Sequence, residues 1–167
     1  LREFLGYDSN YGIKVGLSKA FNVSIDTANR LISEDKSASE ILRPFMQGRG
    51  MVPFGKPDTA SYLLFIPKGF TMKAFGLNPE DKEDRKKMPK EDDAWDRFEK
   101  TYPSIASWLL QFKDEASKRT DKVDYWWELR ACTYYDEFSL PKIFYQRFQV
   151  KPCFIYDEST TFCNDSI

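Results

Sequence analysis

The first third of the chain alternates short apolar stretches with glycines and helix-capping residues. Residues 11–16 and 20–23 are each typical of a short strand, with a glycine-assisted turn between them. Residues 26–32 predict a short helix capped by the aspartate at its start. Residues 37–40 have the sequence of a capping box, and the helix that it opens must be brief because Pro44 disfavours helical geometry at the preceding residue.

The middle of the chain carries the strongest patterns. Residues 62–66 form a continuous apolar run that ends at Pro67, which predicts a strand buried on both faces. The densely charged residues 80–100 predict an exposed loop that leads into a helix near residues 92–99. The clearest helix follows, because apolar residues recur at helical spacing: Ile105, Trp108, Leu109, Phe112 and Ala116.

The C-terminal part predicts strands. Residues 141–149 are typical of a strand, and residues 154–156 with 160–163 predict a hairpin whose turn is formed by residues 157–159. The chain has no internal repeat and no low-complexity linker. The whole pattern predicts a mixed α+β fold.

Length and composition fit one ordinary domain: the chain has 167 residues, of which 41% are hydrophobic and 31% are charged. It has no apolar run of about 18 residues and no signal peptide, so we expect a cytoplasmic protein without a membrane partner. Leu1 in place of a methionine indicates a fragment of a longer polypeptide.

Histidine is absent from the sequence. This absence excludes Ser-His and Cys-His nucleophiles, histidine-ligated metals and histidine general bases. The three cysteines form no CxxC pair, which predicts free thiols in place of a disulfide framework or a zinc site. Carboxylate–metal chemistry, lysine chemistry and binding without chemistry stay open.

The net charge of −1 hides an uneven distribution along the chain. Residues 41–79 contain five basic residues and a single acid, Asp58. Residues 138–156 contain three basic residues and no acid. Phosphate binding needs a local basic surface because charges act within about 8–10 Å in physiological salt. These residues either form such a surface or are ordinary solvated cations.

One string of residues, called the nuclease string from here on, resembles the PD…ExK motif of metal-dependent endonucleases. It consists of Pro57-Asp58 followed by Glu80-Asp81-Lys82. In such a centre, Asp58 and Glu80 would hold a divalent ion while Lys82 positions the attacking water. The string is short, and residues 76–79 do not form the buried strand that normally carries the second element. A metal-dependent nuclease is therefore an alternative interpretation.

The segment Tyr125–Arg147 mixes aromatic side chains with cations and amides. Aromatic faces can stack on bases, and Arg, Lys, Gln and Asn can contact base edges or phosphates. The competing interpretation is that the aromatic residues form the core. We expect Trp126, Trp127 and Leu129 to pack and residues 141–143 to set a strand. The residues left for contact with a ligand are Tyr134, Tyr145, Gln146 and Arg147.

An ordered series of segments covers nearly the whole chain: Tyr11–Leu17 with Ala20-Phe21, Glu40–Phe45 running into Gly48-Arg49, Tyr62–Pro67, Tyr102–Ile105, Leu110–Lys113, Arg119, Trp127–Arg130, Cys132, Phe138 and Pro141–Ile143. This series resembles a known family, the TaqI-like C-terminal specificity domain, which is the target-recognition domain of type IIG restriction enzymes and related adenine-specific DNA methyltransferases.

The resemblance implies a single specificity domain over residues 1–167, with a curved sheet and packed helices. It implies sequence-specific recognition of duplex DNA within a restriction-modification polypeptide. The methyltransferase domain of that polypeptide would be the second partner, and it would flip the target adenine. No catalytic centre, cofactor or metal is then expected in this fragment. S-adenosylmethionine, and magnesium where the parent also cleaves, would belong to the other domains.

Two features depart from the family pattern. Gly50 stands where the family usually has an acid, and the chain ends at Ile167 where members usually continue with further strand. The expected hairpin would then lie at an unfinished edge of the sheet.

The candidate DNA contacts are Arg49, Lys142, Gln146 and Arg147, supported by Lys14 and Arg43. A protein-interaction module that docks a partner on the aromatic residues is a third interpretation.

Overall fold

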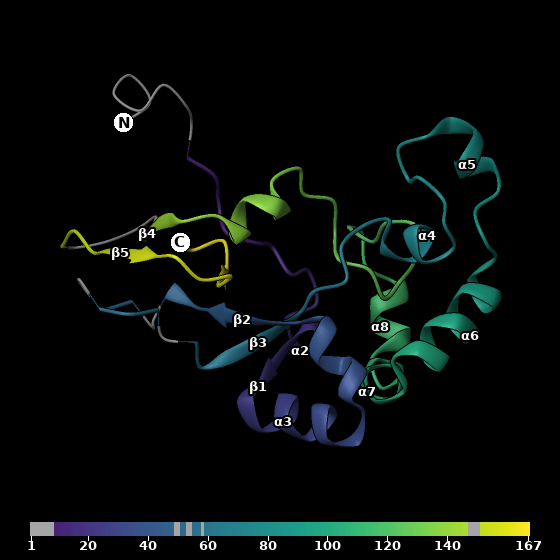
Figure 1. The fold of residues 1–167 in the computed structure, drawn as a ribbon, viewed down its shortest axis with the longest axis horizontal. Coiled ribbons are helices and arrows are strands. Elements are labelled where there is room, and N and C mark those ends of the chain that lie inside the picture. Colours follow the sequence, from purple (N-terminus) through teal and green to yellow (C-terminus); the bar gives the residue numbers. More distant parts are fainter. Residues whose placement is uncertain (1–8, 49–50, 53–54, 58, 147–150) are drawn as a thin grey trace. The chain divides into compact units, whose positions relative to one another are not determined.

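Two groups of segments, each taken from separate parts of the sequence, pack as units of their own in a computed structural model of the chain (Figure 1). The structure describes residues 9–48, 51–52, 55–57, 59–146 and 151–167. The larger unit comprises residues 15–43 and 62–132, and the smaller unit comprises the described residues of 1–14, 44–61 and 133–167. The fold is mixed α+β, as predicted, with a four-stranded sheet in the order β1-β3-β2-β6 and a two-stranded sheet formed by β4 and β5. The assignment of one specificity domain stays a prediction.

The larger unit begins with three short elements: α2 (Ser18–Phe21), β1 (Asn22–Ser24) and α3 (Ile25–Glu34). The Ser24 hydroxyl accepts a hydrogen bond from the Thr27 N–H at 3.1 Å and caps α3. The prediction of Asp26 as the cap was therefore wrong by two residues. The strand predicted at 20–23 is confirmed only in its second half, where β1 begins at Asn22, because α2 takes up residues 18–21. The strand predicted at 11–16 was wrong, since only an isolated bridge forms there, at Ile13.

A single turn of 3₁₀ helix, η1 (Lys36–Glu40), follows α3. The Asp35 carboxylate accepts a hydrogen bond from the Ser37 N–H at 3.0 Å, so Asp35 is the cap and the predicted capping box does not form. The strand β2 (Leu42–Met46) begins shortly after η1 and contains Pro44. The prediction that Pro44 keeps this helix short is confirmed.

The predicted buried strand is present as β3 (Ser61–Leu64). It leads to α4 (Phe70–Ala74), whose N-cap is Gly69 with φ of 81°. A Cβ atom at Gly69 would lie 2.7 Å from the side chain of Pro79, so both the backbone angle and the space favour glycine there.

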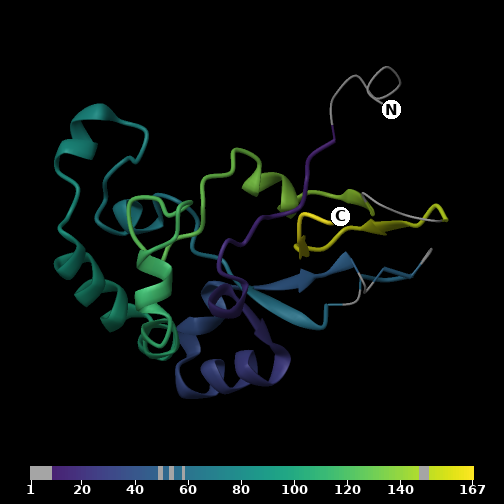
Figure 2. The ribbon, with the colours of Figure 1, turned by 180° about the vertical axis from the view of Figure 1, so that it is seen from behind.

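Four helices complete the larger unit: α5 (Lys82–Lys86), α6 (Glu91–Thr101), α7 (Pro103–Leu110) and α8 (Lys113–Ser117). The predicted loop therefore contains the short α5. The single helix predicted from Ile105 to Ala116 is interrupted at Gln111 and Phe112. The helix α7 packs against both α6 and α3 (Figures 1 and 2).

Aromatic side chains from α6 and from an irregular segment, residues 125–129, form the centre of this unit. The rings of Trp95 and Trp126 stack with centroids 4.7 Å apart, and those of Tyr125 and Trp127 stack at 4.8 Å. The expectation that Trp126, Trp127 and Leu129 pack in the core is confirmed, since all three are buried. Large aromatic rings contribute the most apolar area per residue, so this cluster supplies much of the hydrophobic stabilisation of the unit.

Two charged residues connect this irregular segment to the structure around it by hydrogen bonds. The buried Glu128 carboxylate accepts hydrogen bonds from the N–H groups of Gly69 and Thr71, at 3.0 and 2.8 Å. The Arg119 guanidinium donates to the carbonyls of Trp126 and Glu128, at 3.1 and 2.7 Å. The segment can be buried without regular secondary structure because these bonds replace those of a helix or strand.

In the smaller unit, the end of β2 pairs in parallel with β6 (Phe162–Cys163), with Phe45 opposite Phe162. The ring of Phe162 also stacks on Phe138 at 4.8 Å; Phe138 belongs to the 3₁₀ helix η3 (Tyr135–Ser139). Gly12 lies against the backbone of Asn164, where an added Cβ would come within 1.9 Å of the carbonyl oxygen. This glycine therefore allows a close approach of two backbones.

The remaining strands of the smaller unit are β4 (Lys142–Tyr145) and β5 (Phe154–Asp157), which pair with each other in antiparallel register. The strand predicted in residues 141–149 is thus confirmed over 142–145. The predicted hairpin of residues 154–156 with 160–163 was wrong, because β5 pairs with β4 while β6 pairs with β2.

Glu128 gives the larger unit a pH-dependent stability. Burial raises the pKa of Glu128 to about 7, although its hydrogen bonds to Thr71 and Gly69 favour the carboxylate. A raised folded-state pKa stabilises the protein below the unfolded pKa and loses that contribution as the pH rises through the folded one. We expect urea unfolding to show a loss of about 3 kcal/mol between pH 5 and pH 8.

The substitution Glu128→Gln should remove this pH dependence, because glutamine cannot ionise. It keeps only one of the two acceptor oxygens, so the variant also loses one hydrogen bond at every pH. The exposed Glu99→Gln serves as the matched control and should leave the dependence unchanged. A Glu128→Gln protein whose stability falls with pH as steeply as the wild type would contradict the assignment.

Candidate functional site

The two-stranded sheet of β4 and β5, called the ribbon from here on, has two different faces. Its register places Lys142 opposite Asp157, Ile143 opposite Tyr156, Phe144 opposite Ile155 and Tyr145 opposite Phe154. Because side chains alternate along a strand, every second pair points to the same side. One side is buried in the smaller unit and the other side is open.

The inner face of the ribbon consists of Phe144 and Ile155, which are 5% and 0% exposed, together with the pair Lys142 and Asp157. The Lys142 ammonium lies 2.8 Å from the Asp157 Oδ2 atom. It also donates to the carbonyls of Phe138 and Ser159, at 2.9 and 2.7 Å. Both side chains are largely buried, with 15% and 5% of their area exposed.

This environment changes the role predicted for Lys142. Burial raises the pKa of Asp157, but the hydrogen bonds from Lys142 and Ser159 outweigh it, so the pKa ends below its ordinary value. The carboxylate therefore stays ionised and holds the ammonium inside the unit. We assign Lys142 a structural position in place of the predicted contact with DNA.

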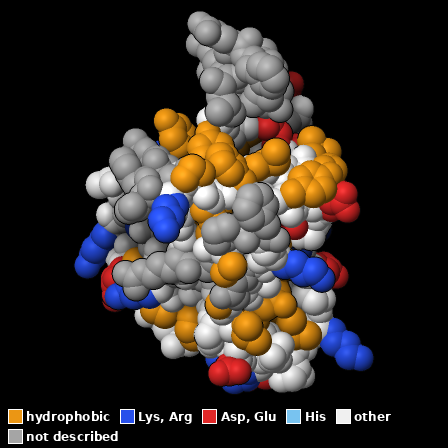
Figure 3. Space-filling view, turned by 90° about the vertical axis from the view of Figure 1, so that its left-hand side faces the viewer, with side chains coloured by type: hydrophobic (Ala, Val, Ile, Leu, Met, Phe, Trp, Pro, Cys, Tyr) orange, Lys and Arg blue, Asp and Glu red, His pale blue; other side chains and the backbone are white. Residues whose placement is uncertain are grey.

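The outer face of the ribbon is apolar and exposed. Ile143 is 63% exposed, Tyr156 60% and Phe154 44%, and Tyr145 is half-buried beside Phe154 with ring centroids 6.2 Å apart. Hydrophobic side chains gather in patches on the side of the molecule shown in Figure 3. Large contiguous apolar patches on protein surfaces mark interaction sites more often than isolated apolar residues do.

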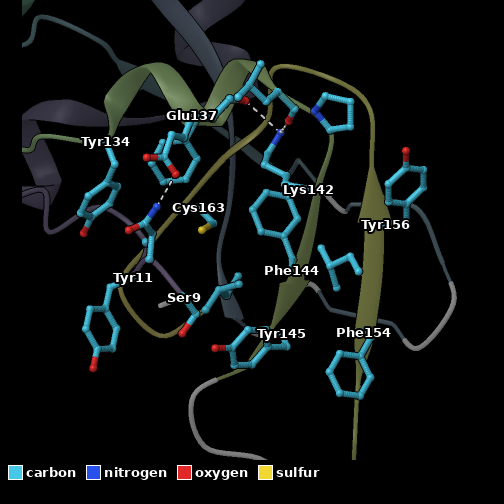
Figure 4. A pocket seen from close by; sticks show the side chains of 17 residues that line it. Ser9, Tyr11, Tyr134, Glu137, Lys142, Phe144, Tyr145, Phe154, Tyr156 and Cys163 are labelled. Atoms are coloured by element: carbon cyan, nitrogen blue, oxygen red, sulfur yellow. Dashed lines mark hydrogen bonds between the residues drawn. The ribbon is translucent and has the colours of Figure 1, made fainter. Parts of the chain in front are cut away.

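A pocket of about 690 Å³ lies beside the ribbon in the smaller unit. Figure 4 shows Tyr11, Tyr134 and Glu137 together on one side of it, while Phe154 and Tyr156 lie on β5. The lining is mainly apolar and aromatic: Ser9, Asn10, Tyr11, Gly12, Tyr134, Glu137, Phe138, Leu140, Pro141, Lys142, Ile143, Phe144, Tyr145, Phe154, Tyr156, Cys163 and Ile167. Its volume and composition are in the range of sites that bind ligands.

The end of β4 brings two predicted contact segments together. The Gln146 side-chain amide donates a hydrogen bond to the Gly48 carbonyl. The predicted contacts Arg49 and Arg147 directly follow these two residues in the sequence, and both lie outside the described residues, as does Gly50. The segments that carry Arg49 and Arg147 therefore each follow a residue of the smaller unit, and these two residues are hydrogen-bonded to each other.

The two supporting cations are found in different surroundings. Lys14 is exposed in the smaller unit. Arg43 belongs to the larger unit, where it is half-buried, donates to the Leu42 carbonyl at 3.0 Å and lies over the ring of Phe65 at 5.8 Å. Arg43 thus has internal contacts that a phosphate would have to compete with.

The residues of the alternative nuclease string are only partly described. Glu80 and Lys82 are exposed next to the start of α5, and Asp58 lies outside the described residues. Among the residues that the structure describes, no three Cys, Asp or Glu side chains are grouped as they would be to hold a metal ion.

All three cysteines are described and none forms a disulfide, as predicted. Burial raises the pKa of Cys163 to about 12, which keeps its thiol protonated at neutral pH although it lines the pocket. A protonated thiol is a poor nucleophile.

Sequence reasoning missed three residues of this region. Asp157 was assigned to the turn and Tyr156 to a strand of the predicted hairpin, and Glu137 was given no role. The alternation of residues 142–145 would have shown two apolar faces, but only the pairing with β5 shows which face is open.

The ion pair between Lys142 and Asp157 beneath the ribbon should be essential for the stability of the smaller unit. The substitution Lys142→Met leaves the Asp157 carboxylate buried without its partner, and we expect urea unfolding to show a loss of about 3 kcal/mol at pH 7. The loss should shrink as the pH falls and Asp157 takes up a proton. The matched control is the exposed Lys151→Met. Equal stability of the two variants would refute the assignment.

No protein-family model matches the chain, and the curated proteins contain no significant match to it. Within the described residues, no helix has both the length and the apolar character needed to cross a membrane.

Proposed function

We propose that the chain is a sequence-specific DNA-recognition module that contacts duplex DNA mainly through the segment joining β4 to β5. This segment begins at Gln146 and continues with Arg147, Gln149 and Lys151, without any acid. Arginine and glutamine can form paired hydrogen bonds with guanine and adenine edges in the major groove.

The observation that carries the proposal is that β4 and β5 pair as a two-stranded antiparallel ribbon and are joined in the sequence by a segment of cations and amides without any acid. A two-stranded antiparallel ribbon is one of the two elements that fit into the major groove of DNA. The strands β4 and β5 form such a ribbon, and the proposed contact segment joins them in the sequence. The hydrogen bond from Gln146 to Gly48 joins the two residues that precede Arg147 and Arg49 in the sequence.

In this proposal the contacts are Arg49, Gln146 and Arg147, with Lys14 in support, while Lys142 positions β4. The chain acts by binding, and catalysis belongs to other domains of a restriction-modification polypeptide, which would include a methyltransferase domain and its S-adenosylmethionine. The family resemblance supports this assignment, and the ribbon geometry is compatible with it.

Binding to DNA should depend steeply on salt. We expect anisotropy titrations of the chain with a labelled duplex pool to show a log–log slope of about −0.9 for each phosphate neutralised. The substitution Arg49→Ala or Arg147→Ala should weaken binding. A lost phosphate contact also reduces the slope by about 1, whereas a lost base contact relaxes sequence preference when the pool is selected and sequenced.

The matched control is Arg30→Ala, which removes an exposed arginine of α3 that pairs locally with Glu34. It should leave affinity and slope unchanged. A chain that binds no duplex at low salt, or whose affinity does not respond to Arg49→Ala or Arg147→Ala, would rule out the proposal.

A further inference from the structure

The outer face of the ribbon is a second surface, separate from the proposed DNA contacts. It is formed by Ile143, Tyr145, Phe154 and Tyr156, and the exposed Leu140 borders the same pocket. These side chains carry no positive charge. A duplex presents a dense row of phosphates, so an uncharged apolar face gains little from DNA.

Acids border this apolar face. Glu137 lines the pocket and is exposed, with its Oε2 atom hydrogen-bonded to the Asn10 amide. Glu158 is exposed two residues after Tyr156, and its carboxylate raises the pKa of the Tyr156 hydroxyl. Among the described residues that line the pocket, Lys142 is the only basic one, and its charge is balanced by Asp157. The border is therefore acidic.

The negative charge of this border determines which binding partners fit the outer face. DNA is repelled by carboxylates. A second copy would bring its own Glu137 and Glu158 to the same interface, because a twofold interface joins identical surfaces. Like charges across an interface disfavour binding, as they would with DNA or a second copy, whereas opposite charges favour a basic partner.

We propose that the outer face of the ribbon docks a protein segment that has an apolar core flanked by lysine or arginine. Its apolar side chains would cover Ile143, Phe154 and Tyr156 and enter the 690 Å³ pocket. Its basic residues would meet Glu137 and Glu158. Exposed aromatic and aliphatic anchors surrounded by a polar border are the usual anatomy of a protein interface.

The proposal is tested with two labelled synthetic peptides that share a core of five apolar residues. One peptide has two lysines at each end and the other has two glutamates. We expect the lysine peptide to bind the chain at least about fivefold more tightly at low salt, with the difference shrinking as salt rises. The charge reversal Glu137→Lys should remove most of this preference.

The apolar contact is tested by Ile143→Lys, which should weaken binding of the lysine peptide by at least about tenfold, or roughly 1.4 kcal/mol. Leu110→Lys, at a position 43% exposed in the larger unit, is the matched control and should have no effect. Because Ile143→Lys could disturb the ribbon, Tyr156→Ser provides a second variant, and circular dichroism and urea unfolding check that each is folded.

Several outcomes would overturn the proposal. These are equal binding of the two peptides, no binding of either, displacement of the lysine peptide by a duplex at equal concentration, or a dimer in sedimentation that Ile143→Lys dissociates. The Arg147→Ala variant should bind the peptide normally, so failure of this proposal can be told apart from failure of the proposed DNA contact.

Discussion

The larger unit depends on the burial of a segment that has no regular secondary structure. Residues 125–129 carry the two most buried tryptophans, yet their backbone forms neither a helix nor a strand. Buried N–H and C=O groups without partners would destabilise the fold. Arg119 donates to two carbonyls of the segment, and the Leu129 N–H donates to the Ile66 carbonyl at 2.7 Å. The Glu128 side chain in turn accepts from the N–H groups of Gly69 and Thr71 and joins the segment to that loop.

The smaller unit meets the same constraint beneath the ribbon. An isolated two-stranded sheet has little stability in water, and it needs packing on at least one face. Phe144 and Ile155 provide that packing, and the Lys142–Asp157 pair closes its end while donating to the carbonyls at Phe138 and Ser159. A buried ion pair contributes little net energy when it is intact, but it strongly disfavours every arrangement that separates its partners. The pair therefore fixes the register of β4 against β5.

Sequence patterns predicted the features that depend on neighbouring residues. The buried strand, the α+β class, the packing of Trp126 and Trp127 and the strand at residues 142–145 follow from local apolar runs. Strand pairing was mispredicted because the local turn at residues 157–159 suggested a hairpin, whereas β6 finds its partner in β2 about 117 residues away, from Phe45 to Phe162. The structural role of Lys142 could not be predicted either, since a lysine in an acid-free segment looks available until Asp157 is placed opposite it.

The same pairing separates two kinds of surface on one small element. Alternation along β4 and β5 sends charge inward at Lys142 and Asp157 and leaves apolar side chains outward, the reverse of an ordinary surface strand. The cations and amides that remain are displaced along the sequence, into the segment after Gln146. A polyanion and an apolar partner would thus meet different parts of the ribbon. Because the ion pair holds both strands in one register, a change at Lys142 should affect both surfaces together, whereas a change at Arg147 or Ile143 should affect only one.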